Sequence, residues 1–191
     1  MPSFGCGLTL IVGVLIFALG NAQAQSSSSW PVTRLDSVAS VSMPYSGSIN
    51  EELAAEGVVM YRTPVSDNNF DVLIITPKLD QPLMPGEWMV MDTKKVLAQV
   101  MKLPDKLFTR PKLQSSYSVT LPSAPNGRAE HQVYSGFDAF HQTDASMELT
   151  WVIVGSSLYI FRCSTQLPQE AETAEDMKHF FTTIAFKQPQ P

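Results

Sequence analysis

The most constraining feature of this 191-residue sequence is a pair of apolar runs on either side of Gly155-Ser156-Ser157. Residues 147–154 and 158–164 are rich in β-branched and aromatic side chains, and so short a link joins only antiparallel neighbours. Apolar residues occupy both alternating faces of the two runs. A strand that is apolar on both faces is covered on both sides. The sequence therefore predicts a central hairpin of an antiparallel sheet.

One face of this hairpin is our candidate ligand face. We assign Trp151, Tyr159 and Phe161 to it because side chains alternate along a strand and all three have odd numbers. The simpler interpretation places these aromatic rings in the core. A partner or a lipid-like ligand that covers this face is the alternative.

The rest of the chain also has strand and helix patterns. The polar link 64–69 predicts that the β-rich runs on either side of it are antiparallel neighbours. Apolar residues at helical spacing predict two amphipathic helices, the first ending at Leu103-Pro104. We thus expect an α+β fold, an antiparallel sheet of about six to seven strands packed by two main helices. The expected strands are 35–43, 57–63, 70–76, 116–121, 128–139 and the central pair, and the expected helices are 85–102 and 170–183.

The C-terminal part resembles a known fold family. Val152-Ile153-Val154-Gly155-Ser156-Ser157-Leu158-Tyr159 is followed by a polar loop with proline, a helix with Phe180-Phe181, and Ile184-Ala185-Phe186. This pattern, with an opening strand that ends at Val41-Ser42-Met43-Pro44, is similar to the PsbP/Mog1-like fold. The resemblance covers most of 35–187 in element order and implies a fold. It implies no activity, because the matching residues are packing and turn positions.

The N-terminal segment is typical of a secretory signal. Residues 8–19 are uncharged and apolar, too short for the roughly 20 residues of a membrane-spanning helix. Ala22-Gln23-Ala24 follows, so we predict a signal peptide at 1–24 with cleavage between Ala24 and Gln25. The usual basic residues before the apolar run are missing, which leaves an uncleaved membrane anchor as the alternative. Beyond the signal we predict a Ser-rich linker at 25–33, a single domain at 34–187 and a polar tail at 188–191. After cleavage no membrane span is expected, and the location is the periplasm or outside the cell.

Removal of that leader leaves Cys163 as the single cysteine. An intramolecular disulfide is then impossible, so the apolar core has to stabilise the domain. A small buried hydrophobic residue is the simplest role for Cys163. Pairing between chains and a nucleophilic thiol remain alternatives.

Charge and motifs exclude several functions. The net charge of −5 argues against nucleic acid as a partner, since phosphate binding needs a clustered basic surface. The sequence has no G-x-S-x-G turn and no phosphate-binding loop. We predict no catalytic residue, no cofactor and no metal site.

Two groups of side chains are candidates for metal binding. Asp138, His141 and Asp144 are close enough in sequence to meet in a loop around a cation, although ordinary solvated loop polarity is the simpler interpretation. If the strand that contains His131 ran on past His141, the two rings would lie roughly 33 Å apart, too far for a common metal. Met84, Met89 and Met91 near Trp88 carry thioethers that suit copper(I), but methionine more often fills gaps in a core.

His179 lies in the predicted last helix, one turn after Glu175. The simplest interpretation is a surface pair between these two side chains.

These observations favour an exported, non-catalytic binding or assembly module of the cell envelope. Its partner is an unknown protein or an apolar ligand, and its oligomeric state is left open. An envelope enzyme with an unrecognised site and a membrane-anchored protein with an uncleaved leader are the alternatives.

Overall fold

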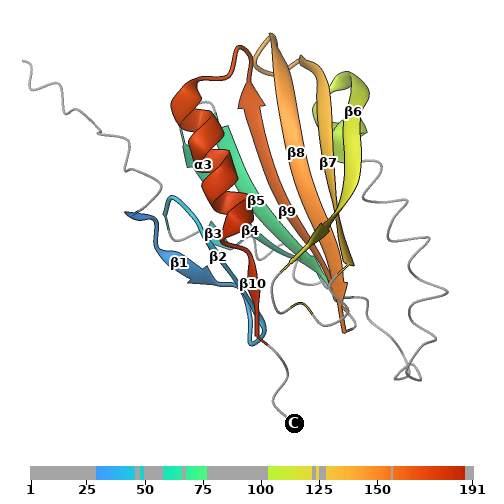
Figure 1. Ribbon diagram of the computed structural model, residues 1–191. Coiled ribbons are helices and arrows are strands. Elements are labelled where there is room, and N and C mark those ends of the chain that lie inside the picture. Colours follow the sequence, from blue (N-terminus) through green and yellow to red (C-terminus); the bar gives the residue numbers. More distant parts are fainter. Residues whose placement is uncertain are drawn as a thin grey trace, which may run out of the picture.

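The computed structural model describes one domain built mainly of β-strands (Figure 1). The described residues are 29–45, 48–49, 58–65, 68–76, 103–121, 124, 128–155 and 157–187. Their strands form two antiparallel sheets, one of seven strands and one of three. In the described part of the chain, no helix combines the length and the apolar character needed to cross a bilayer.

The large sheet has the order β3-β4-β5-β9-β8-β7-β6, and every neighbouring pair is antiparallel. The predicted central hairpin is confirmed, because β8 and β9 lie inside this order. In chain order the strands are β3 (Ser48–Ile49), β4 (Val58–Val65), β5 (Asn68–Ile75), β6 (Thr109–Thr120), β7 (Arg128–Asp138), β8 (Thr143–Val154) and β9 (Ser157–Gln166).

A small sheet and one long helix cover part of the large sheet. The small sheet has the order β1-β2-β10, formed by β1 (Val32–Arg34), β2 (Ala39–Ser42) and β10 (Ala185–Phe186). Helix α3 (Ala171–Thr182) lies across the face of the large sheet near β5 and β9, with β6 at the far edge (Figure 1). After α3 the chain continues into β10, which pairs with β2 near the N-terminal end of the domain.

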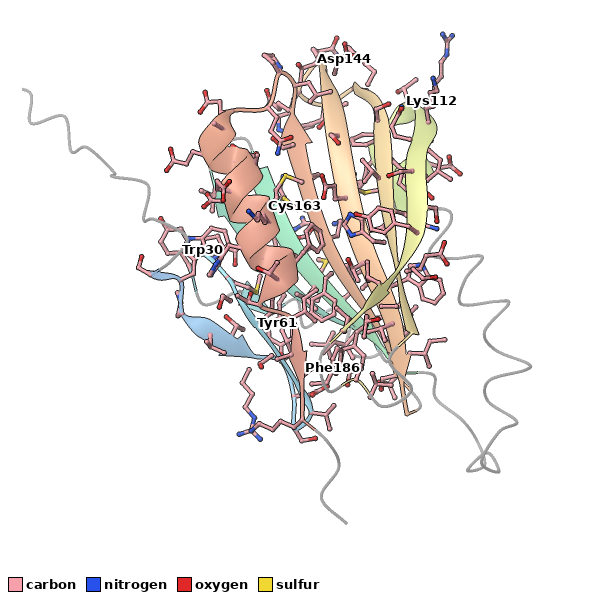
Figure 2. All side chains as sticks on the ribbon, viewed as in Figure 1. Trp30, Tyr61, Lys112, Asp144, Cys163 and Phe186 are labelled. Atoms are coloured by element: carbon pink, nitrogen blue, oxygen red, sulfur yellow. The ribbon has the colours of Figure 1, made fainter. Side chains whose placement is uncertain are left out.

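The two faces of the large sheet have separate apolar cores. On the α3 face, Phe70, Phe161 and Phe180 are fully buried together with the small sheet's Val41. Cys163 and Phe186, labelled in Figure 2, belong to the same core. The opposite face buries a second group around Met147, Leu149, Leu158 and Ile160. Coverage on both sides explains why β8 and β9 are apolar on both faces.

The β8–β9 turn sets the register of the sheet centre. Gly155 has φ of 59°, a left-handed conformation that glycine adopts without steric cost. Val154 pairs with Ser157 across the turn, and Trp151 therefore pairs with Ile160. Residues directly opposite each other point to the same face, so an odd-numbered residue of β8 shares its face with an even-numbered residue of β9.

A second glycine permits a close contact on the opposite face. A Cβ atom at Gly136 would come within 2.6 Å of the Cβ of Phe108, so only glycine lets this phenyl side chain lie against β7. Phe108 directly follows the short helix α2 (Leu103–Leu107). Gly136 therefore fixes where α2 and Phe108 meet the sheet.

The expected fold class, an α+β sheet packed by two main helices, is wrong. The described residues form a mostly β structure of two antiparallel sheets with one long helix, α3. Of the two predicted helices, 170–183 is confirmed as α3, whereas 85–102 lies outside the described residues. Leu103-Pro104, the predicted helix end, instead begins α2. Proline fits the first turn of a helix because its missing N–H would have no partner there.

The predicted linker 25–33 extends too far. Trp30 is 6% exposed, and its ring meets Phe70 edge-on at a centroid distance of 5.1 Å. Strand β1 begins at Val32. Trp30 therefore belongs to the apolar core on the α3 face, and the domain starts by residue 30. Burial of so large an aromatic ring stabilises the fold.

Loss of a core aromatic ring should lower the free energy of unfolding far more than loss of a surface ring. Phe180 is fully buried, and we expect Phe180→Ala to lower the free energy of unfolding by about 3–5 kcal/mol. Phe140 is 88% exposed, and we expect Phe140→Ala to change it by less than about 0.5 kcal/mol. Denaturant unfolding of both variants checks this, and equal losses would contradict the assignment of Phe180 to the core.

Candidate binding groove

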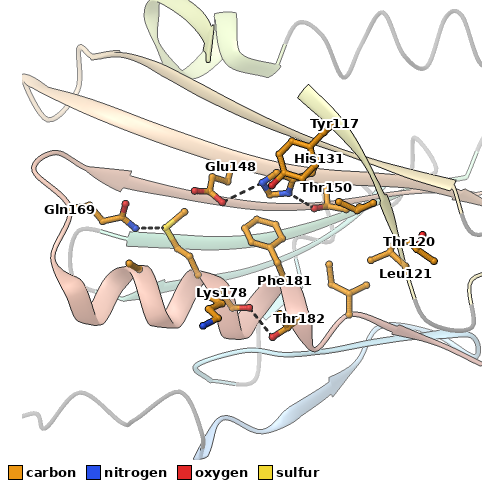
Figure 3. Close-up of a pocket in the computed structure, with 14 residues that line it drawn as sticks. Tyr117, Thr120, Leu121, His131, Glu148, Thr150, Gln169, Lys178, Phe181 and Thr182 are labelled. Atoms are coloured by element: carbon orange, nitrogen blue, oxygen red, sulfur yellow. Dashed lines mark hydrogen bonds and ion pairs between the residues drawn. The ribbon is translucent and has the colours of Figure 1, made fainter. Parts of the chain in front are cut away.

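The first candidate site is a groove between α3 and strands β6, β7 and β8, which we call the helix–sheet groove (Figure 3). Its volume is about 580 Å³. It lies where α3 stops covering the large sheet. The lining residues are Tyr117, Val119, Thr120, Leu121, His131, Glu148, Thr150, Gln169, Ala174, Met177, Lys178, Phe181, Thr182 and Ile184.

His131 lies on the sheet wall of the groove and is 6% exposed. Strand register places Tyr117 of β6 on one side of it and Thr150 of β8 on the other, in one row across three strands. The ring Nδ1 of His131 lies 2.8 Å from the Thr150 hydroxyl, and Nε2 lies 3.4 Å from a carboxylate oxygen of Glu148. Both nitrogens of this buried imidazole therefore have partners within the protein.

Two aromatic rings hold the imidazole from either side. The ring centroid of Tyr117 lies 5.1 Å from that of His131 in a tilted arrangement, and Phe181 of α3 meets it edge-on at the same distance. Figure 3 shows Phe181 pointing from α3 toward His131. The edge-to-face contact with Phe181 is favourable because the positive edge of one ring meets the negative face of the other. The ring stack fixes the width of the groove at this point.

Helical spacing supplies the apolar wall. Ala174, Met177 and Phe181 recur at intervals of three and four residues, so they lie on one side of α3. Val119 and Leu121 face them from the end of β6. The Gln169 side-chain amide contacts the Met177 sulfur at 2.9 Å and closes one end. The floor of the groove is therefore apolar around a single polar row.

Charges lie at the rim of the groove. The side chain of Lys178 is 71% exposed and lies 3.9 Å from Glu175, a solvent-exposed pair that contributes little to stability. Glu148 contacts His131 and is 29% exposed. One acidic and one basic side chain thus border an apolar floor, an arrangement that can orient a polar backbone or head group.

His131 lies between a hydroxyl group and a carboxylate. Its two nitrogens are engaged by Thr150 and Glu148, and this geometry alone does not separate a structural histidine from an acid–base one. None of the described lining residues is a serine or cysteine. Within the described ranges, no group of three or more metal-ligating side chains converges.

The structure separates the three residues of the predicted ligand face. Tyr159 and Phe161 lie in the core under α3, 2% and 0% exposed, whereas Trp151 packs on the opposite face beside Ile160. The assumption of a shared odd-numbered face was wrong, because the register across the turn pairs odd residues of β8 with even residues of β9. The indole N–H of Trp151 has no hydrogen-bond partner within the described part of the chain.

Tyr159 instead joins the two sheets. Its hydroxyl donates a hydrogen bond of 2.6 Å to the carboxylate of Asp36 in the loop between β1 and β2. Burial, and then the adjacent Asp36 carboxylate, raise the pKa of Tyr159 well above its usual value. The hydroxyl of Tyr61 donates to the carbonyl of Leu35 in the same loop. These residues have a structural role.

The candidate cation cluster of Asp138, His141 and Asp144 forms only in part. His141 Nδ1 lies 2.7 Å from Asp138 Oδ2, and Asp138 Oδ1 accepts the backbone N–H of Phe140 and of His141. Asp144 belongs to no metal-ligating group with them among the described residues. Burial alone would raise the pKa of Asp138, but these hydrogen bonds outweigh it and lower the pKa below its usual value. Asp138 thus stabilises the β7–β8 turn.

The other candidate residues lie at a packing contact of α3 or outside the described residues. His179 packs edge-on against Trp30 with ring centroids 5.6 Å apart, and Glu175 pairs with Lys178 instead of with His179 in the described part of the chain. The predicted cleavage residues Ala24 and Gln25 lie outside the described residues. The same holds for Met84, Met89, Met91 and Trp88.

Sequence reasoning missed Tyr117, Glu148, Thr150 and Phe181 as partners of His131. They come from three different elements, β6, β8 and α3, and local patterns carry no register between strands. A turn at 139–142 was the available signal: Asp138 is a residue type that favours turns, and the polar residues His141, Gln142 and Thr143 follow shortly after it. With that turn in place, β7 and β8 pair and Thr150 comes opposite His131.

Comparisons with known proteins give distant structural similarities. No family model and no curated protein matches the chain. A Pseudomonas aeruginosa protein of unknown function, PA94, is 15% identical with a TM-score of 0.46, covering 85% of this chain and 98% of that one. A Bacteroides thetaiotaomicron structure is 14% identical with a TM-score of 0.42, covering 79% of this chain and 46% of that one. Neither similarity identifies a function.

Cys163 should be inert in the folded protein. It is fully buried, and burial, followed by the charges of Glu148 and Asp71, raises the pKa of its thiol well above the usual value. Because the thiolate is the reactive form, we expect no labelling by a thiol reagent at mildly alkaline pH in a Cys6→Ser background. Addition of denaturant should then expose one reactive thiol. Rapid labelling of the native protein would contradict an unreactive thiol and would support Cys163 as a nucleophile.

Proposed function

We propose that the chain is an exported, non-catalytic binding module of the cell envelope whose helix–sheet groove receives a segment of a partner protein. The observation that carries this proposal is the groove itself, with an apolar floor and an imidazole whose two nitrogens are already bonded inside the protein. A concave apolar surface with a few fixed polar groups suits recognition.

Strand β6 favours a protein as the occupant. It is the last strand of the described order, and ten of its twelve residues are exposed. Leu113 and Tyr117 on it are 44% and 51% exposed, and Tyr117 also lines the groove. An exposed sheet edge offers backbone hydrogen bonds to an added strand, and adjacent pockets select its side chains. A partner strand along β6 would place an apolar side chain in the groove.

Relationship to the PsbP/Mog1-like fold family is part of the same proposal. Its support is the sequence pattern of the β8–β9 hairpin, the helix with Phe180-Phe181 and the terminal Ile184-Ala185-Phe186. The proposal of export rests on the apolar residues 8–19 and on Ala22-Gln23-Ala24 after them.

Photo-crosslinking tests the groove. A crosslinking amino acid at Tyr117, on the groove rim, should capture one protein from an envelope extract. Ala174→Trp fills the groove from an exposed helix position and should abolish that crosslink without loss of stability. A crosslinker at Phe137, exposed but outside the groove, is the matched control.

The alternatives give different results in this experiment. A crosslinked species with the mass of a lipid would indicate that the groove binds an apolar ligand and not a protein. A crosslink that persists in Ala174→Trp, or that appears equally at Phe137, would contradict groove recognition.

Export makes its own prediction. Mass spectrometry of the protein from the envelope fraction of its native cell should find a mature N-terminus at Gln25, because a signal peptidase cuts after the small-x-small pattern. An intact N-terminus at Met1 or Pro2 would contradict cleavage and would support the membrane anchor.

A further inference from the structure

Three charged residues form a row on the face of the large sheet opposite α3. Arg62 of β4 pairs with Asp71 of β5, and Asp71 pairs in turn with Arg162 of β9. Asp71 is fully buried. Its Oδ1 accepts the Nε–H of Arg62 at 2.8 Å, and its Oδ2 accepts Nε–H of Arg162 at 3.0 Å and also an N–H from Nη2 of Arg162. Both carboxylate oxygens are thus occupied by guanidinium groups.

Arg162 has more donors than this pair uses. A guanidinium has five N–H donors, and Arg162 directs two of them to one oxygen of Asp71. The other three have no hydrogen-bond acceptor in the part of the chain that the structure describes, although the side chain is only 6% exposed. Among the described residues, the one buried side-chain donor without a partner is the indole N–H of Trp151, so the unused N–H groups of Arg162 are not sealed in the core. Arg162 lines the adjacent cavity, where these groups can donate to an additional acceptor.

A cavity of about 490 Å³ lies beside the row. Arg62, Asp71 and Arg162 form part of its lining, with the side-chain amides of Asn69 and Gln166. Leu107, Phe108 and Phe140 form an apolar part of the same lining. Its volume is within the range of about 300–1,000 Å³ typical of small-molecule sites. We call it the arginine cavity.

Phe140 supplies a second, independent observation. It lies in the turn between β7 and β8, it is 88% exposed, and its one ring contact in the described ranges is with its neighbour His141 at 4.8 Å. A large aromatic side chain in open solvent beside a cavity offers apolar contact to whatever enters. The arginine cavity therefore has a cationic part and an aromatic part.

The formal charges of the lining sum to zero, because two guanidiniums face the carboxylates of Asp71 and Asp138. Arg62 and Arg162 carry two positive charges against one on Asp71. Asp138, the other acidic residue of the lining, is bonded to the His141 ring and to two backbone N–H groups. Asp138 is held by its own hydrogen bonds, so an incoming carboxylate would meet the guanidinium of Arg162.

We propose that the arginine cavity binds a small organic carboxylate with an apolar body. The carboxylate accepts the remaining N–H groups of Arg162, whose planar fork matches two carboxylate oxygens. The apolar body lies against Phe108 and Phe140. Asp71 acts as a positioning residue, because its bonds to Arg62 and Arg162 hold the two guanidiniums in place. This site is separate from the helix–sheet groove, which lies on the other face of the sheet.

Titration calorimetry on the full chain tests the chemical class of the ligand. We expect 3-phenylpropanoate and octanoate to bind, and we expect the neutral analogue 3-phenylpropanamide to bind at least about tenfold more weakly, since it lacks the charge that pairs with Arg162. Acetate and inorganic phosphate, which lack an apolar body, should also bind at least about tenfold more weakly.

Variants locate the site. Phe140→Ala should weaken binding of 3-phenylpropanoate several-fold, and the exposed Phe137→Ala, outside the lining, is the matched control that should leave it unchanged. Arg162→Lys keeps the charge but removes the fork, and should weaken binding at least about tenfold. If Arg162→Lys does not fold, transferred nuclear Overhauser effects between the phenyl group of the ligand and the Phe140 ring provide the same localisation in the unmodified chain.

Four results would overturn the proposal. They are absence of binding by both carboxylates at millimolar concentration, equal affinity for 3-phenylpropanamide, equal affinity for inorganic phosphate, and equal loss of affinity in Phe137→Ala and Phe140→Ala. Equal affinity for phosphate would identify a general anion site without use of the aromatic part.

Discussion

The pairing of Val154 with Ser157 across the β8–β9 turn is the constraint on which the rest of the large sheet depends. From this one register, β9 fixes β5, β5 fixes β4, and β8 fixes β7. Side chains alternate with a period of two, so a slip of one residue would turn every row over. Arg162 would then lie in the apolar core under α3, and Phe161 would take its place beside Asp71. Gly155 in its left-handed conformation is what makes this tight turn possible.

The two faces of the sheet are covered in different ways, and both candidate sites follow from that. On one face, α3 and the small sheet cover β5 and β9 but leave most of β6 exposed, and the groove lies along that boundary. On the other face, the apolar core around Met147 and Ile160 gives way to the charged row and to Phe108 on Gly136. In both places a buried polar side chain lies where apolar cover ends.

Local patterns were enough to predict the hairpins and the last helix, because turn residues and apolar spacing are contained in a few neighbouring residues. They could not predict which side chains meet across the sheet. The assignment of Trp151 to the face of Tyr159 failed because facing depends on turn length as well as on alternation. Arg162 and Asp71 are 91 residues apart, and their contact depends on the pairing of β5 with β9. The expected fold class was wrong because the described residues form two antiparallel sheets with one long helix, α3, and the predicted helix 85–102 lies outside them.

His131 and Arg162 show why burial alone does not identify a ligand site. A buried ion pair is weak evidence for stability, since an apolar replacement of similar volume is often neutral or stabilising. Stability therefore explains neither residue. The two ring nitrogens of His131 match two partners, Thr150 and Glu148, so the imidazole is complete within the fold. The guanidinium of Arg162 carries five donors against the single carboxylate oxygen that it contacts in the described residues. In our proposal, this excess of donors beside a cavity separates the binding role of Arg162 from the structural role of His131.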